Sequence, residues 1–501
     1  MTLSDVLAGV AIRSGIPALV WDLEVAGLDY DSRRLERGFV FFAFAGSRSD
    51  GRQFAGQALD KGVVAIASEL PAPAGLEQVW IEVEHGRRAL ALAARNFHRR
   101  AAEAATLVGI TGTNGKTTTA YITDSILRAA GWTTALVGTV EYHVAGAVRP
   151  ALNTTPESLD LYRILEQLAA GGGRHATMEV SSHALALGRV YGVPFHTAVF
   201  TNLTRDHLDF HGTMENYFAA KKLLFAGEGA APPRRAVLNA DDEFARRIET
   251  SAATETLWYG IGAGETARSG RLLRAVGIRS DFDGLRFEAV LDGQRVELSS
   301  PLIGRVNVYN ILAACGAGLS LGLDWETIAR GVAACRAVPG RFERVEEGQP
   351  FLVLVDYAHT DDALRNSIEV ARGLKPKRVI TLFGCGGDRD RSKRPLMGAA
   401  AASASDFVVL TSDNPRSEDP IAIMNDALVG LGRYDTPRAV EPDRAKAIRL
   451  AIAEAREGDI VILTGKGHES YQVLKDRTIH FDDREAAREA LRSFGYAGGQ
   501  A

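Results

Sequence analysis

A short loop between an apolar run and a helix-like run has the residue types of a phosphate-binding site. The loop Gly112-Thr113-Asn114-Gly115-Lys116-Thr117 follows apolar residues 107–110 and precedes residues 120–127, whose apolar spacing is helical. A strand, a glycine-rich loop and a helix in this order surround an anion with backbone N–H groups and a helix N-terminus. Lys116 would contact the terminal phosphates of a nucleotide, and the Thr117 hydroxyl would bind Mg²⁺. A glycine-rich turn with an incidental lysine is the alternative, which the Gly-Lys-Thr triplet in this context disfavours.

The loop departs from the standard phosphate-binding loop at one position. The standard loop has a glycine five residues before its second glycine, but Ile110 stands there and the earlier glycine is Gly112. The sequence therefore predicts a nucleotide loop unlike that of an ordinary small GTPase or kinase.

Acidic and imidazole side chains follow two further predicted strands of the same region. Glu179 lies at the end of strand 176–180, where a doubly wound sheet binds ligands and a carboxylate suits Mg²⁺, although a plain surface acid is nearly as good an interpretation. Two aspartates and two histidines within residues 206–211 follow strand 198–201, and they either serve a metal or cap a loop. Their spacing does not match zinc, and oxygen ligands with one imidazole fit Mg²⁺ better. Lys221, on a predicted helix, resembles an ordinary solvated lysine.

Three polar loops follow predicted strands in the C-terminal part. Residues 384–389 resemble a dinucleotide-binding fingerprint, but Arg389 replaces its third glycine, so we expect an exposed loop that presents this arginine. In residues 413–416 a planar Arg416 beside an Asn-Pro turn suits capture of a carboxylate, although a plain turn is the alternative. Residues 465–469 form the third loop. Three such loops predict a second ligand site.

Alternating strand and helix patterns predict an α/β protein of three domains. Apolar runs separated by helical segments indicate a mostly parallel sheet with both faces covered. The predicted domains are a small N-terminal α/β domain (1–105), a central P-loop domain with a mostly parallel sheet (106–336) and a C-terminal Rossmann-like α/β domain (337–501). The central strands are expected at 107–110, 135–140, 176–180, 198–201 and 236–239, antiparallel-like strands within 271–298 and a helix at 308–321. The C-terminal strands are expected at 351–355, 379–383, 407–410 and 460–463.

Composition excludes several classes of protein. With 46% hydrophobic and 24% charged residues, the chain is typical of a globular protein, and its net charge of −4 argues against a mainly electrostatic nucleic-acid binder. Three cysteines, spaced for neither a disulfide framework nor zinc, suit a reducing compartment. The first residues lack the pattern of a signal peptide, and no apolar run is long enough to span a bilayer. We therefore expect a cytoplasmic protein that binds no nucleic acid and does not insert into a membrane.

These motifs, in this order, resemble the Mur ligase family, ATP-dependent amino-acid ligases of peptidoglycan synthesis. The resemblance covers nearly the whole chain and rests on the loop 112–117, Asn202-Leu203-Thr204-Arg205-Asp206-His207, Asn307-Val308-Tyr309-Asn310 and Asp356-Tyr357-Ala358-His359-Thr360. The chain is most similar to members that add meso-2,6-diaminopimelate to UDP-N-acetylmuramoyl-L-alanyl-D-glutamate (UDP-MurNAc-L-Ala-D-Glu). The motifs that favour these members are Asp31-Ser32-Arg33, Asn153-Thr154-Thr155, Met178-Glu179-Val180-Ser181-Ser182-His183 and Asp413-Asn414-Pro415-Arg416.

The resemblance implies a role for particular residues. Contacts with ATP are implied for Gly112, Thr113, Asn114, Gly115, Lys116, Thr117, Thr118, Asn307, Arg341 and Asp356. Contacts with the uridine nucleotide and the muramoyl dipeptide are implied for Tyr30, Ser32, Ser47, Arg48, Ser49, Asn153, Thr154, Thr155, Ser181 and Arg189. Diaminopimelate contacts are implied for Arg389, Asp413, Asn414, Pro415, Arg416, Gly465 and Glu469. The implied Mg²⁺ ligands are Thr117, Glu179, His207 and Lys221, the last as a carbamate formed with CO₂, and the implied catalytic residues are Lys116, Glu179, His207 and Lys221.

The resemblance also implies a reaction. ATP phosphorylates the D-glutamyl side-chain carboxylate, and the incoming amine attacks the resulting acyl phosphate. Leu187 stands where relatives can carry a polar substrate contact, whereas Arg305 and Asp361 depart from the usual pattern without removing a reacting group. The sequence indicates no oligomeric state.

Three alternatives stay open. The same ligation with L-lysine is the first. A folylpolyglutamate synthase-like ligase is the second, but that enzyme lacks a uridine-binding N-terminal domain, whereas residues 1–105 precede the phosphate loop here. A P-loop regulatory switch without ligation chemistry is the third, and the predicted second ligand site argues against it.

Overall fold

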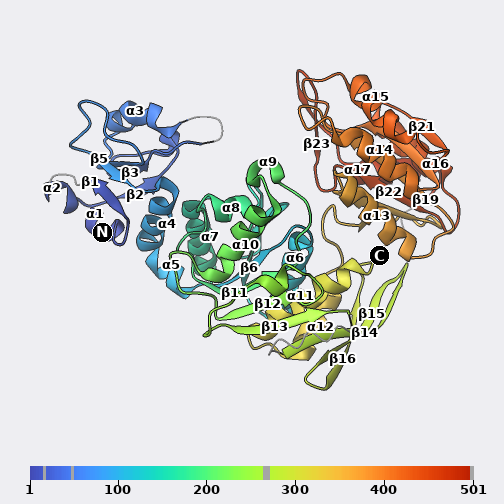
Figure 1. Cartoon of the computed structure of the whole chain (residues 1–501), viewed down its shortest axis with the longest axis horizontal. Coiled ribbons are helices and arrows are strands. Elements are labelled where there is room, and N and C mark those ends of the chain that lie inside the picture. Colours follow the sequence, from blue (N-terminus) through green and yellow to red (C-terminus); the bar gives the residue numbers. More distant parts are fainter. Residues whose placement is uncertain (15–17, 47–49, 263–270, 497–501) are drawn as a thin grey trace. The chain divides into compact units, whose positions relative to one another are not determined.

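The computed structural model describes residues 1–14, 18–46, 50–262 and 271–496, and the strands among them form four sheets (Figure 1). Contacts divide the chain into two units. The first comprises Met1–Arg274, Val290–Arg295 and Tyr309–Gly331, and the second comprises Ala275–Ala289, Val296–Val308 and the residues from Val332 onward. None of the described helices is long and apolar enough to cross a membrane.

A small sheet near the N-terminus has the strand order β1-β5-β4-β3-β2. Strands β2 to β5 pair in parallel, and β1 pairs with β5 antiparallel. Val40, Phe41 and Phe42 of β3 are buried. The strands are β1 (Ile12–Ser14), β2 (Gly27–Asp29), β3 (Phe39–Phe42), β4 (Ala65–Ser68) and β5 (Trp80–Val83). The helices are α1 (Leu3–Val6), α2 (Ala18–Trp21), η1 (Ser32–Arg34), η2 (Gly51–Phe54), α3 (Ala55–Asp60), α4 (Gly86–Phe97) and α5 (Arg99–Ala104).

The central sheet is mostly parallel, as the sequence predicts. Its eleven strands follow the order β16-β15-β14-β13-β12-β11-β6-β10-β7-β8-β9. Strands from β14 to β7 pair in parallel along this order, and β8 and β9 add an antiparallel edge. The strands are β6 (Thr106–Thr111), β7 (Thr134–Val137), β8 (Glu141–Val144), β9 (Ala147–Pro150), β10 (His175–Glu179), β11 (Phe195–Phe200), β12 (Arg235–Asn239), β13 (Glu255–Gly260), β14 (Arg271–Asp281), β15 (Gly284–Leu291) and β16 (Gln294–Ser300).

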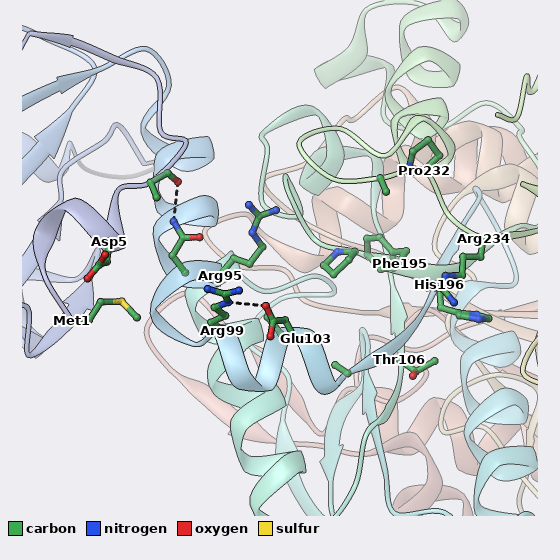
Figure 2. Close-up of a pocket in the computed structure, with 16 residues that line it drawn as sticks. Met1, Asp5, Arg95, Arg99, Glu103, Thr106, Phe195, His196, Pro232 and Arg234 are labelled. Atoms are coloured by element: carbon green, nitrogen blue, oxygen red, sulfur yellow. Dashed lines mark hydrogen bonds and ion pairs between the residues drawn. The ribbon is translucent and has the colours of Figure 1, made fainter. Parts of the chain in front are cut away.

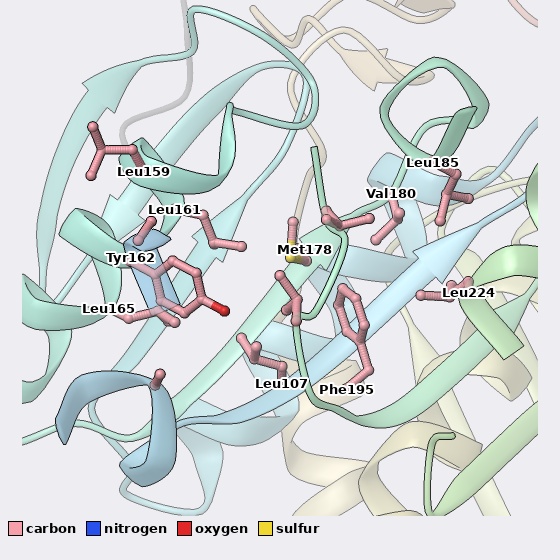
Figure 3. Close-up of a cluster of buried hydrophobic side chains, with 14 of the residues drawn as sticks. Leu107, Leu159, Leu161, Tyr162, Leu165, Met178, Val180, Leu185, Phe195 and Leu224 are labelled. Carbon is pink, nitrogen blue, oxygen red and sulfur yellow. The ribbon is translucent and has the colours of Figure 1, made fainter. Parts of the chain in front are cut away.

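Helices between these strands bury the apolar faces of the sheet. Figure 3 shows Leu107 of β6, Phe195 of β11 and Tyr162 of α7, which belong to one cluster of buried side chains. The same cluster includes Val40 and Ile81 of the N-terminal sheet, whereas Phe41 and Ile66 of that sheet belong to a separate cluster. The helices are α6 (Lys116–Ala129), α7 (Ser158–Ala170), α8 (Ser182–Ala186), α9 (Leu208–His211), α10 (Met214–Ala226), η3 (Ala245–Arg247), α11 (Val306–Ser320) and α12 (Trp325–Ala334).

The C-terminal sheet has two buried faces. Its strands follow the order β17-β18-β22-β19-β20-β21, and all neighbours pair in parallel except β17 with β18. Alternate strand residues pack on one face against α13, α14 and α15 and on the other against α16 and α17, as in a doubly wound fold. The strands are β17 (Glu343–Arg344), β18 (Leu352–Asp356), β19 (Val379–Cys385), β20 (Phe407–Ser412), β21 (Arg438–Val440) and β22 (Ile460–Thr464), with β23 (Tyr471–Val473) and β24 (Thr478–His480) as a separate hairpin. The helices are α13 (Asp361–Gly373), α14 (Lys393–Ala404), α15 (Pro420–Leu431), α16 (Arg444–Glu454) and α17 (Asp483–Ser493).

One expected strand is shorter than its apolar run. The sequence predicts a strand at 135–140, but β7 ends at Val137. The backbone N–H of Thr139 donates to the carboxylate of Glu179 at 2.8 Å instead of to a neighbouring strand. The chain therefore leaves the sheet where a buried carboxylate offers its N–H a partner.

Candidate functional site

Two glycines shape the loop between β6 and α6. Gly115 has φ 85°, and a Cβ there would lie 2.4 Å from Oδ1 of Asn310. Gly112 has φ 149°, and a Cβ there would lie 1.9 Å from Oγ1 of Thr201. Both positions therefore require glycine. The loop leaves the carboxyl end of β6 and leads into the N-terminus of α6 at Lys116, the predicted geometry for phosphate binding.

The segment after β11 fixes the backbone of this loop. The side chain of Asn202 accepts the N–H of Asn114 at 3.0 Å and donates to its carbonyl at 3.1 Å. The hydroxyl of Thr201 donates to the same carbonyl at 2.6 Å. Ile110, where the standard loop has glycine, is a fully buried residue of β6. Side chains from the neighbouring segment thus hold this loop in shape, and no sequence signal identified that role for Asn202.

Two lysines contact one carbonyl of the loop. Nζ of Lys116 donates to the carbonyls of Gly112 and Thr113, both at 2.9 Å. Nζ of Lys221, on α10, donates to the Gly112 carbonyl at 2.8 Å, and its side chain is buried. Burial, reinforced by the charge of Lys116 and opposed by Asp206, lowers the pKa of Lys221 well below its usual value. The lowered pKa favours the neutral amine, which is a nucleophile.

A buried carboxylate lies beside the first turn of α6. Oε2 of Glu179 accepts the hydroxyl of Thr117 at 3.0 Å and that of Thr139 at 3.1 Å, and the Glu179 side chain is buried at the end of β10. The structure thus brings together two predicted Mg²⁺ ligands, Thr117 and Glu179. Thr118 is buried in the same turn. Thr139 was missed, because the sequence places it inside an apolar run.

His207 lies at the start of α9 in a left-handed conformation with φ 52°. Its ring packs edge-on against His183, with the ring centroids 4.9 Å apart, and against Tyr217 at 6.0 Å. Burial lowers the pKa of His207, which favours the neutral imidazole that binds metals. The nearby His211 is buried, unlike the exposed His207, and burial lowers the pKa of His211 to about 4.

These donors fit Mg²⁺ without forming a closed cage. Among the residues that the structure describes, no three His, Cys, Asp or Glu side chains are arranged to hold a metal ion. Mg²⁺ commonly keeps several waters and takes one or two carboxylates beside substrate phosphates. The Thr117 hydroxyl and the Glu179 carboxylate, 3.0 Å apart at the phosphate loop, provide such a partial set.

Residues predicted to hold the muramoyl dipeptide surround Glu179. Oγ1 of Thr155 donates to the Glu179 carbonyl at 2.8 Å and accepts the N–H of Ser181 at 3.0 Å. Arg189 donates to the Thr155 carbonyl at 3.1 Å. The hydroxyls of Thr154 and Thr139 are 3.1 Å apart, and Asn153 has an exposed side chain. The structure therefore gathers these predicted residues at the carboxyl end of β10.

The structure describes only two of the residues predicted to bind the uridine nucleotide, Tyr30 and Ser32. The hydroxyl of Tyr30, which follows β2, donates to Asp160 of α7, and the Tyr30 ring stacks on Phe44 with centroids 6.1 Å apart. Ser32 is buried, and its carbonyl accepts Nζ of Lys61 at 2.9 Å. The remaining predicted residues, Ser47, Arg48 and Ser49, lie outside the described residues.

Three predicted ATP contacts belong to the second unit. Asp356 ends β18, where its carboxylate accepts the hydroxyl of Ser367 at 2.8 Å and the N–H of Phe342 at 3.1 Å. The guanidinium of Arg341 lies 5.0 Å from the ring centroid of Tyr357. The amide of Asn307 donates to the carbonyl of Ile303 at 2.7 Å, near the start of α11.

The C-terminal loops meet at the carboxyl ends of three strands. Arg416, after β20, has φ 52° and donates through Nη1 to the carbonyl of Gly387, after β19, at 2.8 Å. Arg389 is exposed, as predicted, and donates to the Asp388 carbonyl at 3.0 Å. Among the other predicted residues, the amide of Asn414 donates a hydrogen bond to the carboxylate of Glu469. Asp413 lies against Gly465, and Pro415 is buried.

A fully buried ion pair lies under two of these loops. Arg444, the first residue of α16, donates to both oxygens of Asp483 at 2.7 and 2.6 Å. Its guanidinium also donates to the carbonyls of Thr464 at 2.8 Å and Ser412 at 3.4 Å, the last residues of β22 and β20. Arg444 therefore joins the two strand ends that carry the loops. Nothing in the sequence around Arg444 indicates this role, because arginines on helices are usually exposed.

Arg444→Met is expected to lower the free energy of unfolding by about 3–5 kcal/mol, because it leaves Asp483 as a buried charge without its partner. Urea unfolding followed by circular dichroism measures the change. Lys446→Met, two residues away on α16 with a side chain 72% exposed, is the matched control and should change the stability by less than about 1 kcal/mol. Equal effects of the two substitutions would contradict the structural role of Arg444.

A cavity of about 870 Å³ lies away from all these residues (Figure 2). Thr106, Phe195 and Arg234 line it at or beside the amino ends of β6, β11 and β12, whereas the phosphate loop follows the carboxyl end of β6. Arg99 and Glu103 within it already pair at 2.7 Å. Ligands of doubly wound sheets bind at the carboxyl ends of strands, so the candidate site is the phosphate loop and not this cavity.

Known proteins resemble the chain along its whole length. Residues 24–98 match the Mur ligase family catalytic domain, residues 110–318 the Mur ligase middle domain, and residues 340–467 the Mur ligase glutamate ligase domain. A UDP-N-acetylmuramoyl-L-alanyl-D-glutamate–2,6-diaminopimelate ligase of Solibacter usitatus (strain Ellin6076) is 65% identical over 496 residues, which are 99% of both chains. A protein of the same name from Syntrophomonas wolfei is 44% identical over 472 residues, 94% of this chain and 95% of the relative.

Solved structures share the fold. A structure of a UDP-N-acetylmuramoyl-L-alanyl-D-glutamate–2,6-diaminopimelate ligase is 31% identical, with a TM-score of 0.70 and 99% of both chains covered. The MurF ligase from Thermotoga maritima in complex with ADP is 20% identical, with a TM-score of 0.61 over 95% of this chain and 98% of that one. With three matching segments and a relative 65% identical over 99% of its length, the chain belongs to the Mur ligase family.

Proposed function

We propose that the chain is an ATP-dependent, ADP-forming ligase that adds meso-2,6-diaminopimelate to the D-glutamyl carboxylate of UDP-MurNAc-L-Ala-D-Glu in peptidoglycan precursor synthesis. One observation carries the proposal, namely the meeting of Lys116, Thr117, Glu179 and Lys221 at the phosphate loop. The full-length relatives named for this reaction support the choice of substrates.

The reaction has two chemical steps. A carboxylate oxygen of the acceptor attacks the γ-phosphorus of ATP, and ADP leaves with the electrons of the broken P–O bond. The neutral amine of the amino acid then attacks the acyl carbon, phosphate leaves with the carboxylate oxygen, the nitrogen releases one proton to water, and an amide remains. Lys116 and the loop N–H groups are suited to stabilise charge on the transferring phosphoryl group. Thr155, Ser181 and Arg189 are proposed to hold the acceptor beside it.

We also propose that Lys221 becomes a carbamate. The neutral amine attacks the carbon of CO₂, its N–H proton passes to water, and an N-carboxylate anion results. The lowered pKa of Lys221 favours the neutral amine that this step needs. Together with Thr117, Glu179 and His207, the carboxylate would complete an oxygen-rich set for Mg²⁺, which when bound neutralises charge on the phosphates.

The same proposal includes three domains, at residues 1–105, 106–336 and 337–501, and a cytoplasmic location. It also includes the remaining predicted contacts with ATP, the uridine nucleotide and diaminopimelate. L-Lysine is the competing amino-acid substrate.

An assay of ADP release tests the function. We expect release to require UDP-MurNAc-L-Ala-D-Glu and diaminopimelate together. Rapid release from ATP alone would favour a nucleotide switch, and release with a folate acceptor would favour the other ligase.

Lys116→Ala is expected to lower turnover by about 10²-fold or more, the usual loss when one preorganised electrostatic contact is removed. In the structure the Lys116 ammonium lies over the loop carbonyls of Gly112 and Thr113, beside the proposed phosphate position. Steady-state ADP release at saturating substrates measures the effect. Turnover near that of the unsubstituted protein would contradict the assignment of the loop.

A further inference from the structure

Lys466, two residues after the end of β22, has a buried side chain. Its relative exposure is 0%, and Nζ lies 3.2 Å from Oδ1 of Asn414 and 3.2 Å from Oε2 of Glu469. Burial of an ammonium group is unfavourable unless oxygen atoms compensate the charge. Asn414 and Glu469 provide that compensation, and both are predicted contacts of the amino-acid substrate.

The contact with Lys466 fixes the orientation of the Asn414 amide. Oδ1 of Asn414 accepts both Nζ of Lys466 and the N–H of Val473, the latter at 2.9 Å. A rotated amide would direct its NH₂ group at these two donors. Nδ2 therefore points the other way and donates to Oε2 of Glu469 at 2.9 Å.

The same contacts leave one oxygen of Glu469 available. Oε2 accepts hydrogen bonds from Lys466 and Asn414, whereas Oε1 accepts none from the residues that the structure describes. The Glu469 side chain is 15% exposed, so its carboxylate lies at the edge of the loop cluster. A fixed carboxylate oxygen at such a place is an acceptor for an ammonium group.

We propose that Lys466 is a positioning residue, which holds Glu469 so that Oε1 receives the ammonium group of the incoming diamino acid that does not react. The attacking amine must be neutral, so a carboxylate in this site recognises the other amino group. The inference rests on the proposed ligase function. Lys466 acts through Glu469 and Asn414 and touches no substrate itself.

Lys466→Met removes the charge and keeps the length of the side chain. We expect the KM for diaminopimelate to rise by about tenfold, the effect of losing roughly 1.4 kcal/mol of binding, with the KM values for ATP and the nucleotide acceptor within about twofold. Lys446→Met, an exposed lysine of the same unit, is the control and should leave all three constants unchanged. A rise in all three KM values, or a change in kcat alone, would indicate a general structural defect and would overturn the inference.

A double-mutant cycle tests whether Lys466 acts through Glu469. In a Glu469→Gln background, Lys466→Met should raise the KM for diaminopimelate by less than about threefold, because coupled residues are not additive. A full tenfold rise in that background, or an unchanged KM in the single variant, would overturn the inference. If Lys466→Met does not fold, Lys466→Gln takes its place with the same expected rise. If the unsubstituted protein shows no ligation at all, the proposed function is refuted. Failure of the inference about Lys466 can therefore be distinguished from failure of the proposed function.

Discussion

Lys221→Ala is expected to lose about 10³-fold in ligation rate and to regain part of it in short carboxylic acids such as acetate. The alanine variant lacks the proposed carbamate, and a small carboxylate can occupy the space that the buried side chain leaves. ADP release over a range of acetate concentrations measures the rescue. The adjacent Lys222→Ala is the matched control, because Lys222 lies on the same helix and is only partly buried; it should keep most of its activity and gain nothing from acetate.

Depletion of CO₂ provides a second measure for Lys221. The unsubstituted protein should lose activity in buffer depleted of CO₂ and recover it when bicarbonate is added. The amine needs to be neutral to react, and burial of Lys221 beside Lys116 favours that form. Full activity without CO₂, together with a mass spectrum and electron density of an unmodified lysine, would contradict the carbamate.

Arg416→Ala is expected to abolish most of the preference for diaminopimelate over L-lysine. Diaminopimelate carries one carboxylate more than lysine, and Arg416 uses only Nη1 in the hydrogen bonds made among the described residues. Nε and Nη2 are left to bind that carboxylate, and with lysine they would stay unpaired. Sites that bind a substrate group can reject analogues without it by roughly 10⁴-fold.

The ratio of kcat/KM for meso-diaminopimelate to that for L-lysine measures this selection. We expect a ratio of about 10⁴ in the unsubstituted protein and a fall of at least about 10² in Arg416→Ala. Arg433→Ala, an exposed arginine of the same unit, is the matched control and should keep the ratio. If the unsubstituted protein uses both amino acids equally, or if Arg416→Ala keeps its preference, Arg416 is not the selector.

Local sequence patterns were sufficient to predict the strand and the loop that form the phosphate-binding site. The apolar run before Gly112 forms β6, and the spaced glycines form the loop. The strand and the loop could be predicted because the structure of each depends on a few consecutive residues. Glu179 lies at a strand end for the same reason. Chain order and apolar periodicity thus predicted where the phosphate loop and its carboxylate lie.

Residues that act through tertiary contacts could not be found in this way. Lys221 has the sequence context of a solvated helical lysine, and only the family resemblance singled it out before the fold placed it under the loop. Asn202 and Thr139 lie in the segments after β11 and β7, and their partners belong to other parts of the chain. Nothing in the residues next to them in the sequence indicates those contacts. Arg444 is buried only because β20, β22 and α17 converge on it.

The central claim is that the acceptor carboxylate is activated as an acyl phosphate before the amine attacks. Oxygen-18 in the D-glutamyl side-chain carboxylate of UDP-MurNAc-L-Ala-D-Glu tests it directly, with mass spectrometry of the phosphate released during ligation with diaminopimelate. The account predicts one labelled oxygen in each phosphate, because the bond between the acyl carbon and the bridging oxygen breaks. Phosphate without the label, formed while the amide product accumulates, would contradict the account.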